Sequence, residues 1–126
     1  MDKPAADLLF LAKKYPNWDM AAIAQQVEGK QKSKNKLPTW FQKEGLLYPV
    51  RLSMEQCSSE LTAQYKAQLS KGENFIDLTG GFGVDSYFIS QSFSKGVHCE
   101  LNSEIQTIVA QNFNTLGANI RSFNED

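Results

Sequence analysis

The sequence predicts an α/β fold in which a helical region, residues 1–48, precedes three parallel strands that alternate with helices over residues 49–126. Two observations predict this organisation. Before Pro49, apolar residues recur at helical spacing. After it, short apolar runs alternate with amphipathic stripes that are followed by glycines. Strands that alternate with helices of this length form parallel, right-handed βαβ units.

The N-terminal region is expected to hold two helices and an aromatic turn. The first helix starts near Asp2 and Pro4 and stops before Pro16, and its apolar face is Ala5, Leu8, Leu9 and Ala12. Asp19 is expected to cap the second helix and Gly29 to end it, with an inward face of Ile23, Ala24 and Val27. A polar stretch, residues 30–36, leads to a turn that carries Trp40 and Phe41 and closes at Gly45.

Helices and strands are expected to alternate after Pro49. A capping box of Ser53 and Gln56 opens a helix that ends at Gly72 and faces inward through Met54, Cys57, Leu61, Tyr65 and Leu69. The strands are residues 75–78, 97–100 and 120–123. The helix between the first two is marked by Val84, Phe88 and Phe93 and ends at Gly96. The last helix carries a stripe of Ile105, Ile108, Val109, Phe113 and Leu116 and ends at Gly117.

Composition and charge exclude several classes of protein. The formal net charge is −1, so nothing global indicates nucleic acid or a membrane surface as a partner. The longest apolar run, residues 8–12, is too short to cross a bilayer, and no small-residue cleavage site follows it. We therefore expect a cytoplasmic protein without a membrane partner. Cys57 and Cys99 are expected to be free thiols, and no metal site is expected from one histidine and two distant cysteines.

The residues that indicate chemistry follow the first predicted strand. Asp77 lies inside that strand, and the turn after it contains Thr79, Gly80, Gly81, Gly83 and Asp85. Glycines let a ligand approach the backbone closely, and parallel sheets bind ligands at the carboxyl ends of their strands. Glu100 ends the second predicted strand, at the distance where such folds place a ribose-binding carboxylate, and Asp126 follows the third.

A glycine-rich turn alone leaves alternatives open. The run Gly81-Phe-Gly83-Val-Asp-Ser86 also resembles a dinucleotide fingerprint, which would indicate an oxidoreductase domain. Asp77 favours another ligand, because a carboxylate there opposes a pyrophosphate but suits a cationic ammonium. The amphipathic helix before the first strand is also not needed by a dinucleotide-binding unit. Alternatively, the glycines only make a sharp turn and Asp85 caps the helix.

The run Asp77-Leu-Thr-Gly-Gly-Phe-Gly83 resembles motif I of class I S-adenosylmethionine-dependent methyltransferases, with Thr79 where the first glycine usually stands. With Lys36-Leu-Pro-Thr-Trp40 and Leu52-Ser-Met-Glu-Gln-Cys-Ser-Ser-Glu60, it resembles a Bacteroidetes-type methyltransferase family. Members of this family have a helical N-terminal region, a Rossmann-like domain and a C-terminal THUMP-like domain. The resemblance covers essentially the whole chain.

The resemblance implies S-adenosyl-L-methionine as cofactor and specific roles for the site residues. Asp77, Gly81 and Gly83 would line its methionine part, Glu100 would bind the ribose hydroxyls, and Asp126 would lie near the adenine. Gln56, Ser58 and Ser59 either reach the methionine carboxylate or only cap and decorate their helix. The THUMP-like domain, which this sequence lacks, hints at an RNA substrate and so at RNA modification.

The resemblance also implies that this sequence is a truncated part of the family's protein. A class I methyltransferase sheet has seven strands, whereas only the first half of such a sheet, three strands, is predicted here. The catalytic residues are expected beyond Asp126, so we expect no methyl transfer by the fragment. The first strand would keep an unpaired edge, which predicts self-association.

A basic segment provides a further candidate site. Lys30, Lys32, Lys34 and Lys36, with Trp40 close behind, could contact RNA phosphates and stack on a base. Alternatively, the lysines form a solvated loop and the aromatic residues belong to the core. A non-enzymatic module that binds RNA or protein therefore remains a third functional class. His98 lies within a predicted strand and is expected to be structural.

Overall fold

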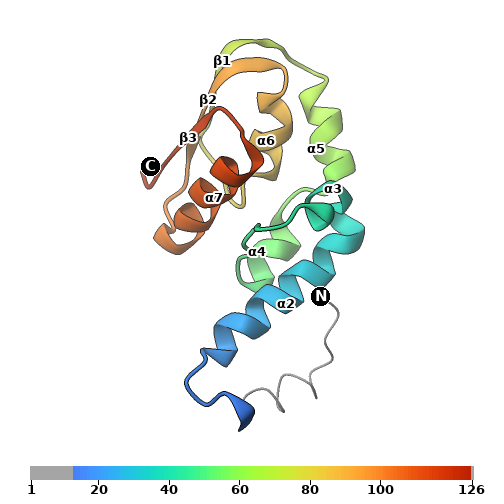
Figure 1. Ribbon diagram of the computed structural model, residues 1–126. Coiled ribbons are helices and arrows are strands. Elements are labelled where there is room, and N and C mark those ends of the chain that lie inside the picture. The colour runs from blue at the N-terminus through green and yellow to red at the C-terminus, as the bar shows by residue number, and fades with distance from the viewer. Residues whose placement is uncertain (1–12, 126) are drawn as a thin grey trace.

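The computed structural model describes residues 13–125, which contain one parallel sheet and a set of helices (Figure 1). The predicted first helix lies almost wholly outside the described residues. The helices are α2 (Met20–Lys36), α3 (Pro38–Gln42), α4 (Arg51–Gln56), α5 (Glu60–Ala67), α6 (Val84–Ser90) and α7 (Ser103–Leu116). The strands are β1 (Gly72–Asp77), β2 (Phe93–Cys99) and β3 (Ile120–Phe123).

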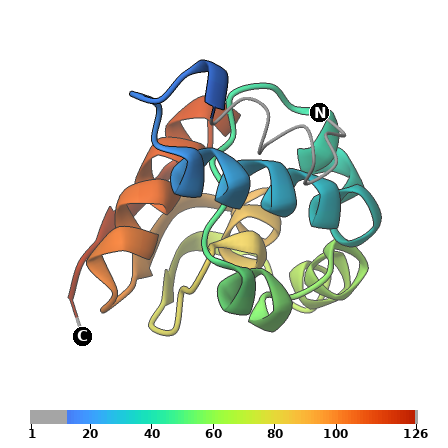
Figure 2. The same ribbon diagram turned by 90° about the horizontal axis from the view of Figure 1, so that it is seen from below.

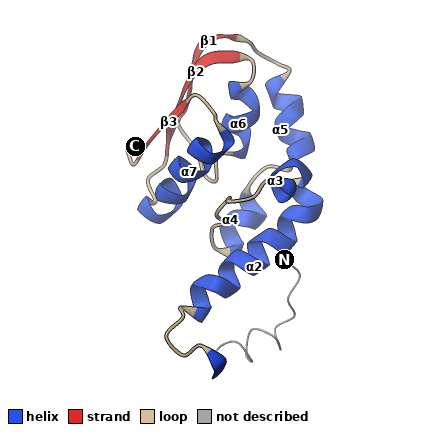
Figure 3. Ribbon diagram, in the orientation of Figure 1, coloured by secondary structure: helices blue, strands red, loops and turns tan. Residues whose placement is uncertain are grey.

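The predicted α/β fold is confirmed. All strand pairs are parallel, and their order in the sheet is β1-β2-β3. The register places Asp77 beside His98 and His98 beside Ser122, so these three side chains share one face of the sheet. The helices α6 and α7 cover that face (Figure 3).

The helix α2 begins as predicted but ends later. Asp19 caps it and accepts a hydrogen bond from the backbone N–H of Ala22 at 3.0 Å. The prediction that Gly29 ends the helix is wrong, because residues 30–36 continue it to Lys36. Gly29 serves packing instead. A Cβ at this position would lie 2.2 Å from Tyr48 Cβ, so only glycine lets the two backbones approach this closely.

The single helix predicted from Ser53 to Gly72 is also wrong, because two helices occupy this segment. Val50 rather than Ser53 precedes α4, and the chain then becomes extended at Cys57 and Ser59, with ψ angles of 154° and 158°. Ser59 caps α5 by accepting a hydrogen bond from Thr62 N at 3.2 Å. The expected inward face is only partly buried: Met54 is buried, whereas Leu61, Tyr65 and Leu69 are exposed.

The second strand starts earlier than predicted. Phe93 and Gly96 belong to β2, so the prediction that they lie at the end of the preceding helix is wrong. Gly96 lies beneath the ring of Phe75 on β1, where an added Cβ would come within 2.3 Å of that ring. By contrast, α7, its end at Gly117 with φ 69°, and β3 are confirmed as predicted.

One hydrophobic core joins the N-terminal helices to the sheet. Leu37, Trp40, Leu46 and Tyr48 pack in the same buried cluster as Phe82, Val84, Phe88, Val109 and Phe113. Figure 2 shows α2 lying across the helices that cover the sheet. Among residues 13–125, no helix is both long and apolar enough to cross a membrane.

Candidate functional site

The predicted glycine-rich loop follows β1 and is fixed by backbone hydrogen bonds. Gly80 N donates to Cys99 O at 3.0 Å, which ties the loop to the end of β2. Gly83 N donates to Gly80 O at 2.9 Å and closes the turn before α6. The loop therefore lies at the carboxyl edge of the sheet, where open parallel sheets bind their ligands.

The three glycines of the loop differ in what a larger side chain would meet at their positions. A Cβ at Gly80 would lie 2.2 Å from the His98 ring, so this position is limited by packing. Gly83 has φ 84°, and a Cβ there would lie 2.8 Å from Phe113 Cζ. Gly81 has φ 50°, but the nearest atom to its added Cβ is 3.9 Å away. Gly81 is therefore the loop glycine with open space beside it, where a ligand can approach the backbone.

Asp77 lies at the junction of β1 and the loop and is half-buried. Its Oδ1 accepts a hydrogen bond from Thr79 N at 3.1 Å, and its Oδ2 accepts one from the Ser86 hydroxyl at 2.6 Å. Both donors are uncharged, and no lysine or arginine of residues 13–125 forms an ion pair with this carboxylate. The site thus presents a carboxylate without a counter-charge.

Asp85, in the first turn of α6, has the opposite electrostatic environment from that of Asp77. Its Oδ2 accepts hydrogen bonds from the Ser58 hydroxyl at 3.0 Å and from Lys66 Nζ at 3.0 Å. The Lys66 contact is an ion pair between α5 and α6. Asp85 lies in the first turn of α6, but its side chain makes no capping hydrogen bond there. The alternative in which Asp85 caps this helix is therefore not observed, and its place in the cofactor site stays a prediction.

The remaining acidic candidates lie at the ends of β2 and β3. Glu100 follows β2, is half-buried, and accepts a long hydrogen bond of 3.4 Å from Asn102 N. Its backbone N–H donates to Phe123 O at 3.0 Å, which fixes its position beside the end of β3. Asp126 lies outside the described residues. The structure therefore brings Asp77 and Glu100 to adjacent strand ends of one edge.

Gln56 and Ser59 flank the short segment between α4 and α5. Gln56 is exposed at the last residue of α4. The Ser59 hydroxyl is occupied as the cap of α5 and also bonds to Thr62 Oγ1 at 2.9 Å. Ser58 bonds to Asp85 and so contacts the start of α6 directly. Of these three residues, only Ser58 forms a side-chain hydrogen bond to α6 within residues 13–125.

His98 is fully buried beneath the loop. Its Nε2 lies 3.0 Å from Gly81 O, and its Nδ1 lies 2.9 Å from the Ser122 hydroxyl. A carbonyl only accepts, so Nε2 must carry a proton. Gln106 Nε2 donates to Ser122 Oγ at 3.2 Å and completes this chain of polar contacts. His98 therefore supports the loop from below, in agreement with the structural role expected for it.

The lysines of the basic segment lie on α2, and three of them bond within the molecule. Lys36 Nζ donates to Met54 O at 2.8 Å and Glu55 O at 2.9 Å, at the end of α4. Lys32 pairs with Glu55 at 3.2 Å, and Lys30 bonds to Phe41 O and lies over the Phe41 ring. Lys34 is exposed. The segment is thus a helix that fastens α3 and α4, not the solvated loop of the alternative interpretation.

Trp40 is fully buried against the side chains of Phe82 and Tyr87, both in edge-to-face geometry. Its ring centroid lies 5.2 Å from that of Phe82. Stacking on a base would require the indole to leave this core. The structure therefore places Trp40 in the core, which is the alternative that the sequence left open.

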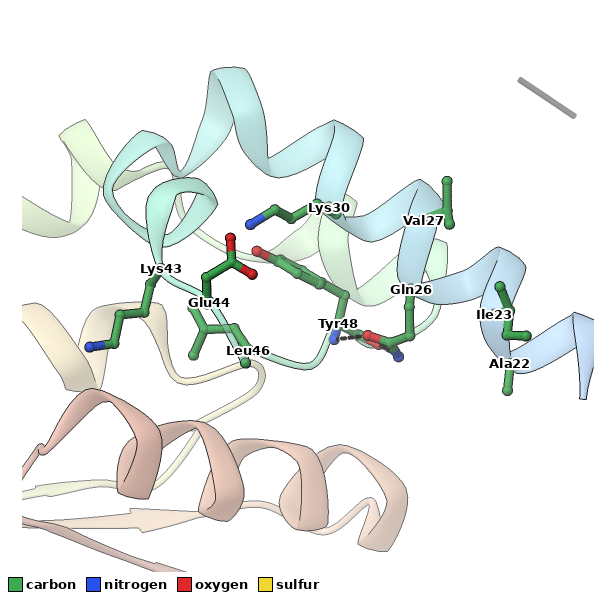
Figure 4. Close-up of a pocket in the computed structure, with 10 residues that line it drawn as sticks. Ala22, Ile23, Gln26, Val27, Lys30, Lys43, Glu44, Leu46 and Tyr48 are labelled. Carbon is green, nitrogen blue, oxygen red and sulfur yellow. Dashed lines mark hydrogen bonds between the residues drawn. The ribbon is translucent and has the colours of Figure 1, made fainter. Parts of the chain in front are cut away.

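A mostly apolar cavity lies away from the glycine-rich loop (Figure 4). It has a volume of about 460 Å³ and lies between α2 and the segment that follows α3. Ile23, Val27 and Leu46 are among its apolar lining residues, and Lys30, Lys43 and Glu44 are its charged ones (Figure 4). No residue from Asp77 to Gly83 lines it.

The two cysteines are free, and no cluster of three metal-binding side chains occurs in residues 13–125. Burial raises the pKa of the Cys57 thiol, and the nearby Lys36 ammonium only partly opposes this effect. The thiol therefore stays protonated and unreactive near neutral pH.

Several residues of the site were missed by sequence reasoning. Ser86 and Lys66 have no motif that indicates their partners, because both bonds depend on how α5 and α6 pack. The available signal for a site role of Ser86 was its position, with Asp85, in the first turn of the helix that follows the loop. The structural role expected for His98 agrees with the structure, but its partner Ser122 follows only from the strand register, and its partner Gly81 only from the conformation of the loop.

Comparison with known proteins agrees with this fold. A solved structure from Porphyromonas gingivalis, described as a "putative methyltransferase", has a TM-score of 0.75 and 31% identity to this chain. The match covers 96% of this chain and 36% of that one, so this chain spans about a third of the other protein's length. No family model and no curated protein matches the sequence.

A second solved structure, an rRNA methylase from Streptococcus thermophilus, has a TM-score of 0.45 and 18% identity. That match covers 52% of this chain and 40% of the methylase, and it is too weak to support an argument. The three parallel strands with their helices thus have the Rossmann-like fold of a methyltransferase.

Proposed function

We propose that this chain carries the S-adenosyl-L-methionine-binding part of a methyltransferase. The observation that supports this most is Asp77, a half-buried carboxylate at the glycine-rich loop without a counter-charge among residues 13–125. A carboxylate there attracts the ammonium of a methionine moiety and repels a pyrophosphate. The likeness of the fold to a methyltransferase structure supports the same function.

The residues at this edge fit the cofactor. Gly81 has open space beside its backbone, so the methionine part can approach the loop. Glu100 bonds only weakly to Asn102 N and keeps acceptor capacity for the hydroxyls of a ribose. Asp77 and Glu100 end adjacent strands, so one extended ligand can reach both.

The bound cofactor would supply a methyl group that its sulfonium already activates. This chain's residues would bind and orient it: Asp77 would hold the ammonium, the Gly81 backbone would line the methionine part, and Glu100 would hold the ribose. Their contribution to catalysis is proximity. The residues that hold the methyl acceptor are proposed to lie outside residues 1–126, so we expect no methyl transfer by this chain alone.

A dinucleotide is the competing ligand, and one contact disfavours it. In dinucleotide sites, backbone amides of the glycine-rich turn face the pyrophosphate. Here Thr79 N donates to Asp77 Oδ1 and is not free for a phosphate.

RNA is the substrate class that we propose for the longer protein, on the family resemblance alone. The lysines of α2 give it little support, because Lys30, Lys32 and Lys36 bond within the molecule. Charge reversal of Lys34, the exposed lysine, tests whether this helix contacts RNA. A lower affinity for single-stranded RNA at two salt concentrations would support contact, and unchanged affinity would exclude it.

Calorimetric titration with S-adenosylhomocysteine tests the proposed function. We expect the chain to bind S-adenosylhomocysteine and not NAD. Asp77→Asn should lower the affinity for S-adenosylhomocysteine at least about tenfold, which corresponds to about 1.4 kcal/mol. Glu73→Gln is the matched control, because it removes an exposed carboxylate from the same strand. Binding of NAD in place of S-adenosylhomocysteine, or of neither ligand, would contradict the proposal for this chain.

A further inference from the structure

The first turn of α6 is tied to two other elements by consecutive side chains. Ser86 donates to Asp77 at the end of β1, at 2.6 Å. Asp85 faces α5, where its Oδ2 accepts from Ser58 and from Lys66, each at 3.0 Å. Lys66 also donates to the Ser58 hydroxyl at 3.1 Å, so the three side chains form a closed triangle.

The triangle fixes a segment whose backbone is extended. Cys57 and Ser59 both have ψ near 155°, so residues 57–59 are outside α4 and α5. No acceptor among residues 13–125 takes a hydrogen bond from the backbone N–H of Ser58 or Ser59. Ser58 is therefore the point at which this segment is attached to the start of α6.

Asp85 also has an unusual feature that fold stability does not explain. Its Oδ1 is buried and has no hydrogen-bond partner among the described residues. Leaving a buried acceptor unpaired destabilises a folded protein. Such groups are uncommon in folded proteins, and each calls for a specific explanation, such as a functional role or a bound water.

We infer that Asp85 is a positioning residue that holds residues 57–59 against the first turn of α6, which directly follows the glycine-rich loop, so that they bound the methionine end of the cofactor site. This inference rests on the proposed function. The two acids of the site then have separate roles, set by their surroundings. Asp77 has no counter-charge among residues 13–125 and meets the ligand's ammonium, whereas Lys66 neutralises Asp85, so that Asp85 does not repel the ligand's carboxylate.

The test compares two ligands that differ only at the methionine end. Methylthioadenosine shares the adenosine and sulfur of S-adenosylhomocysteine but lacks its amino-acid part. For Asp85→Asn, which keeps the side-chain shape and loses the charge, we expect at least tenfold weaker binding of S-adenosylhomocysteine and unchanged binding of methylthioadenosine. Glu28→Gln is the control, because it removes an ion-paired carboxylate on α2.

A double-mutant cycle tests the triangle itself. Lys66→Met should also weaken the binding of S-adenosylhomocysteine, because it leaves the Asp85 carboxylate without its counter-charge beside the ligand. Asp85→Asn combined with Lys66→Met should be no worse than Asp85→Asn alone, because the two residues act as one unit. If the affinity losses of the two single variants add up in the double variant, the claim that Asp85 and Lys66 act as one unit is overturned. If Asp85→Asn lowers the folded fraction, Ser58→Ala removes a single hydrogen bond and serves for the same ligand comparison.

The outcomes separate this inference from the proposed function. Equal losses for both ligands, or unchanged affinity for S-adenosylhomocysteine, would overturn the positioning role of Asp85. If the unsubstituted protein binds neither ligand, the proposed function fails instead.

Discussion

Tyr48 lies directly against the backbone of Gly29, so that a Cβ at residue 29 would come within 2.2 Å of Tyr48 Cβ. The neighbouring atom is itself a Cβ, so no rotation of the tyrosine side chain relieves the contact. The two segments must therefore separate before any larger residue fits. This contact joins α2 to the extended chain that leads into α4.

Gly29→Ala should destabilise the protein although alanine favours helices. Alanine gains about 1 kcal/mol over glycine inside a helix, whereas overpacking a core costs about 1–3 kcal/mol. We expect a net loss in the free energy of unfolding, measured by urea denaturation. Gln31→Ala, at an exposed position of the same helix, should change it little. A more stable Gly29→Ala variant would show that the contact is not rigid.

Gly81→Ala and Gly83→Ala should differ in their cost. Both positions have positive φ, which costs an alanine about 1–2 kcal/mol. Only at Gly83 would the new Cβ also meet Phe113 and Val109, at 2.8 and 2.9 Å. We therefore expect a larger loss of stability for Gly83→Ala in urea denaturation. Equal losses would mean that backbone conformation alone sets the cost.

Asn112→Ala should strongly weaken the link between α7 and the N-terminal region. The fully buried Asn112 accepts from Leu47 N and donates to Leu47 O, each at 2.8 Å. Its removal leaves two backbone groups unpaired, so we expect a loss of about 2 kcal/mol or more. Asn114→Ala, at an exposed position of the same helix, is the control. Similar stabilities of the two variants would contradict this role.

Alkaline pH should destabilise the protein. Burial raises the pKa of Tyr48 and of Cys57 above their ordinary values. The folded protein then keeps these protons at pH values where the unfolded chain releases them, so the free energy of unfolding falls as pH rises through about 9–10. Denaturation curves across this range check the slope. Tyr48→Phe and Cys57→Ala together should flatten it, and an unchanged slope would exclude both groups.

The outer edge of β1 should promote self-association. Within residues 13–125 no strand pairs with this edge, and Ile76 and Leu78 beside it are 64% and 72% exposed. We expect sedimentation coefficients that rise with protein concentration, and a smaller rise for Ile76→Lys. A monomer at all concentrations would contradict the prediction.

The last helix and the third strand could be predicted with their bounds because their signals are local, whereas the first two strands begin earlier than predicted. The stripe of α7 repeats over four turns and ends at a glycine with positive φ, so periodicity and capping agree. Glycine gives a false helix-end signal where its role is packing. Gly29 and Gly96 were interpreted as helix ends, but each admits an aromatic side chain from a distant segment. Sequence spacing does not distinguish the two uses of glycine.

The candidate site was predictable in its backbone and less so in its contacts. The loop and the strand-end acids follow from motif and topology, because parallel strands bring their carboxyl ends to one edge. The bonds of Ser86 to Asp77 and of Lys66 to Asp85 depend on the packing of α5 and α6. The bond between Lys66 and Asp85 could not be predicted from a continuous helix through residues 57–59, which the structure does not have.

The shared core also couples distant parts of the molecule energetically. Since Trp40 and Tyr48 pack with Phe82 of the glycine-rich loop, α2 and α3 cannot open without exposing the surface that holds this loop. Amide hydrogens in the middle of α2 should therefore exchange with solvent only through a cooperative opening of both parts. A ligand bound at the loop would then slow exchange in α2, a helix that it does not touch.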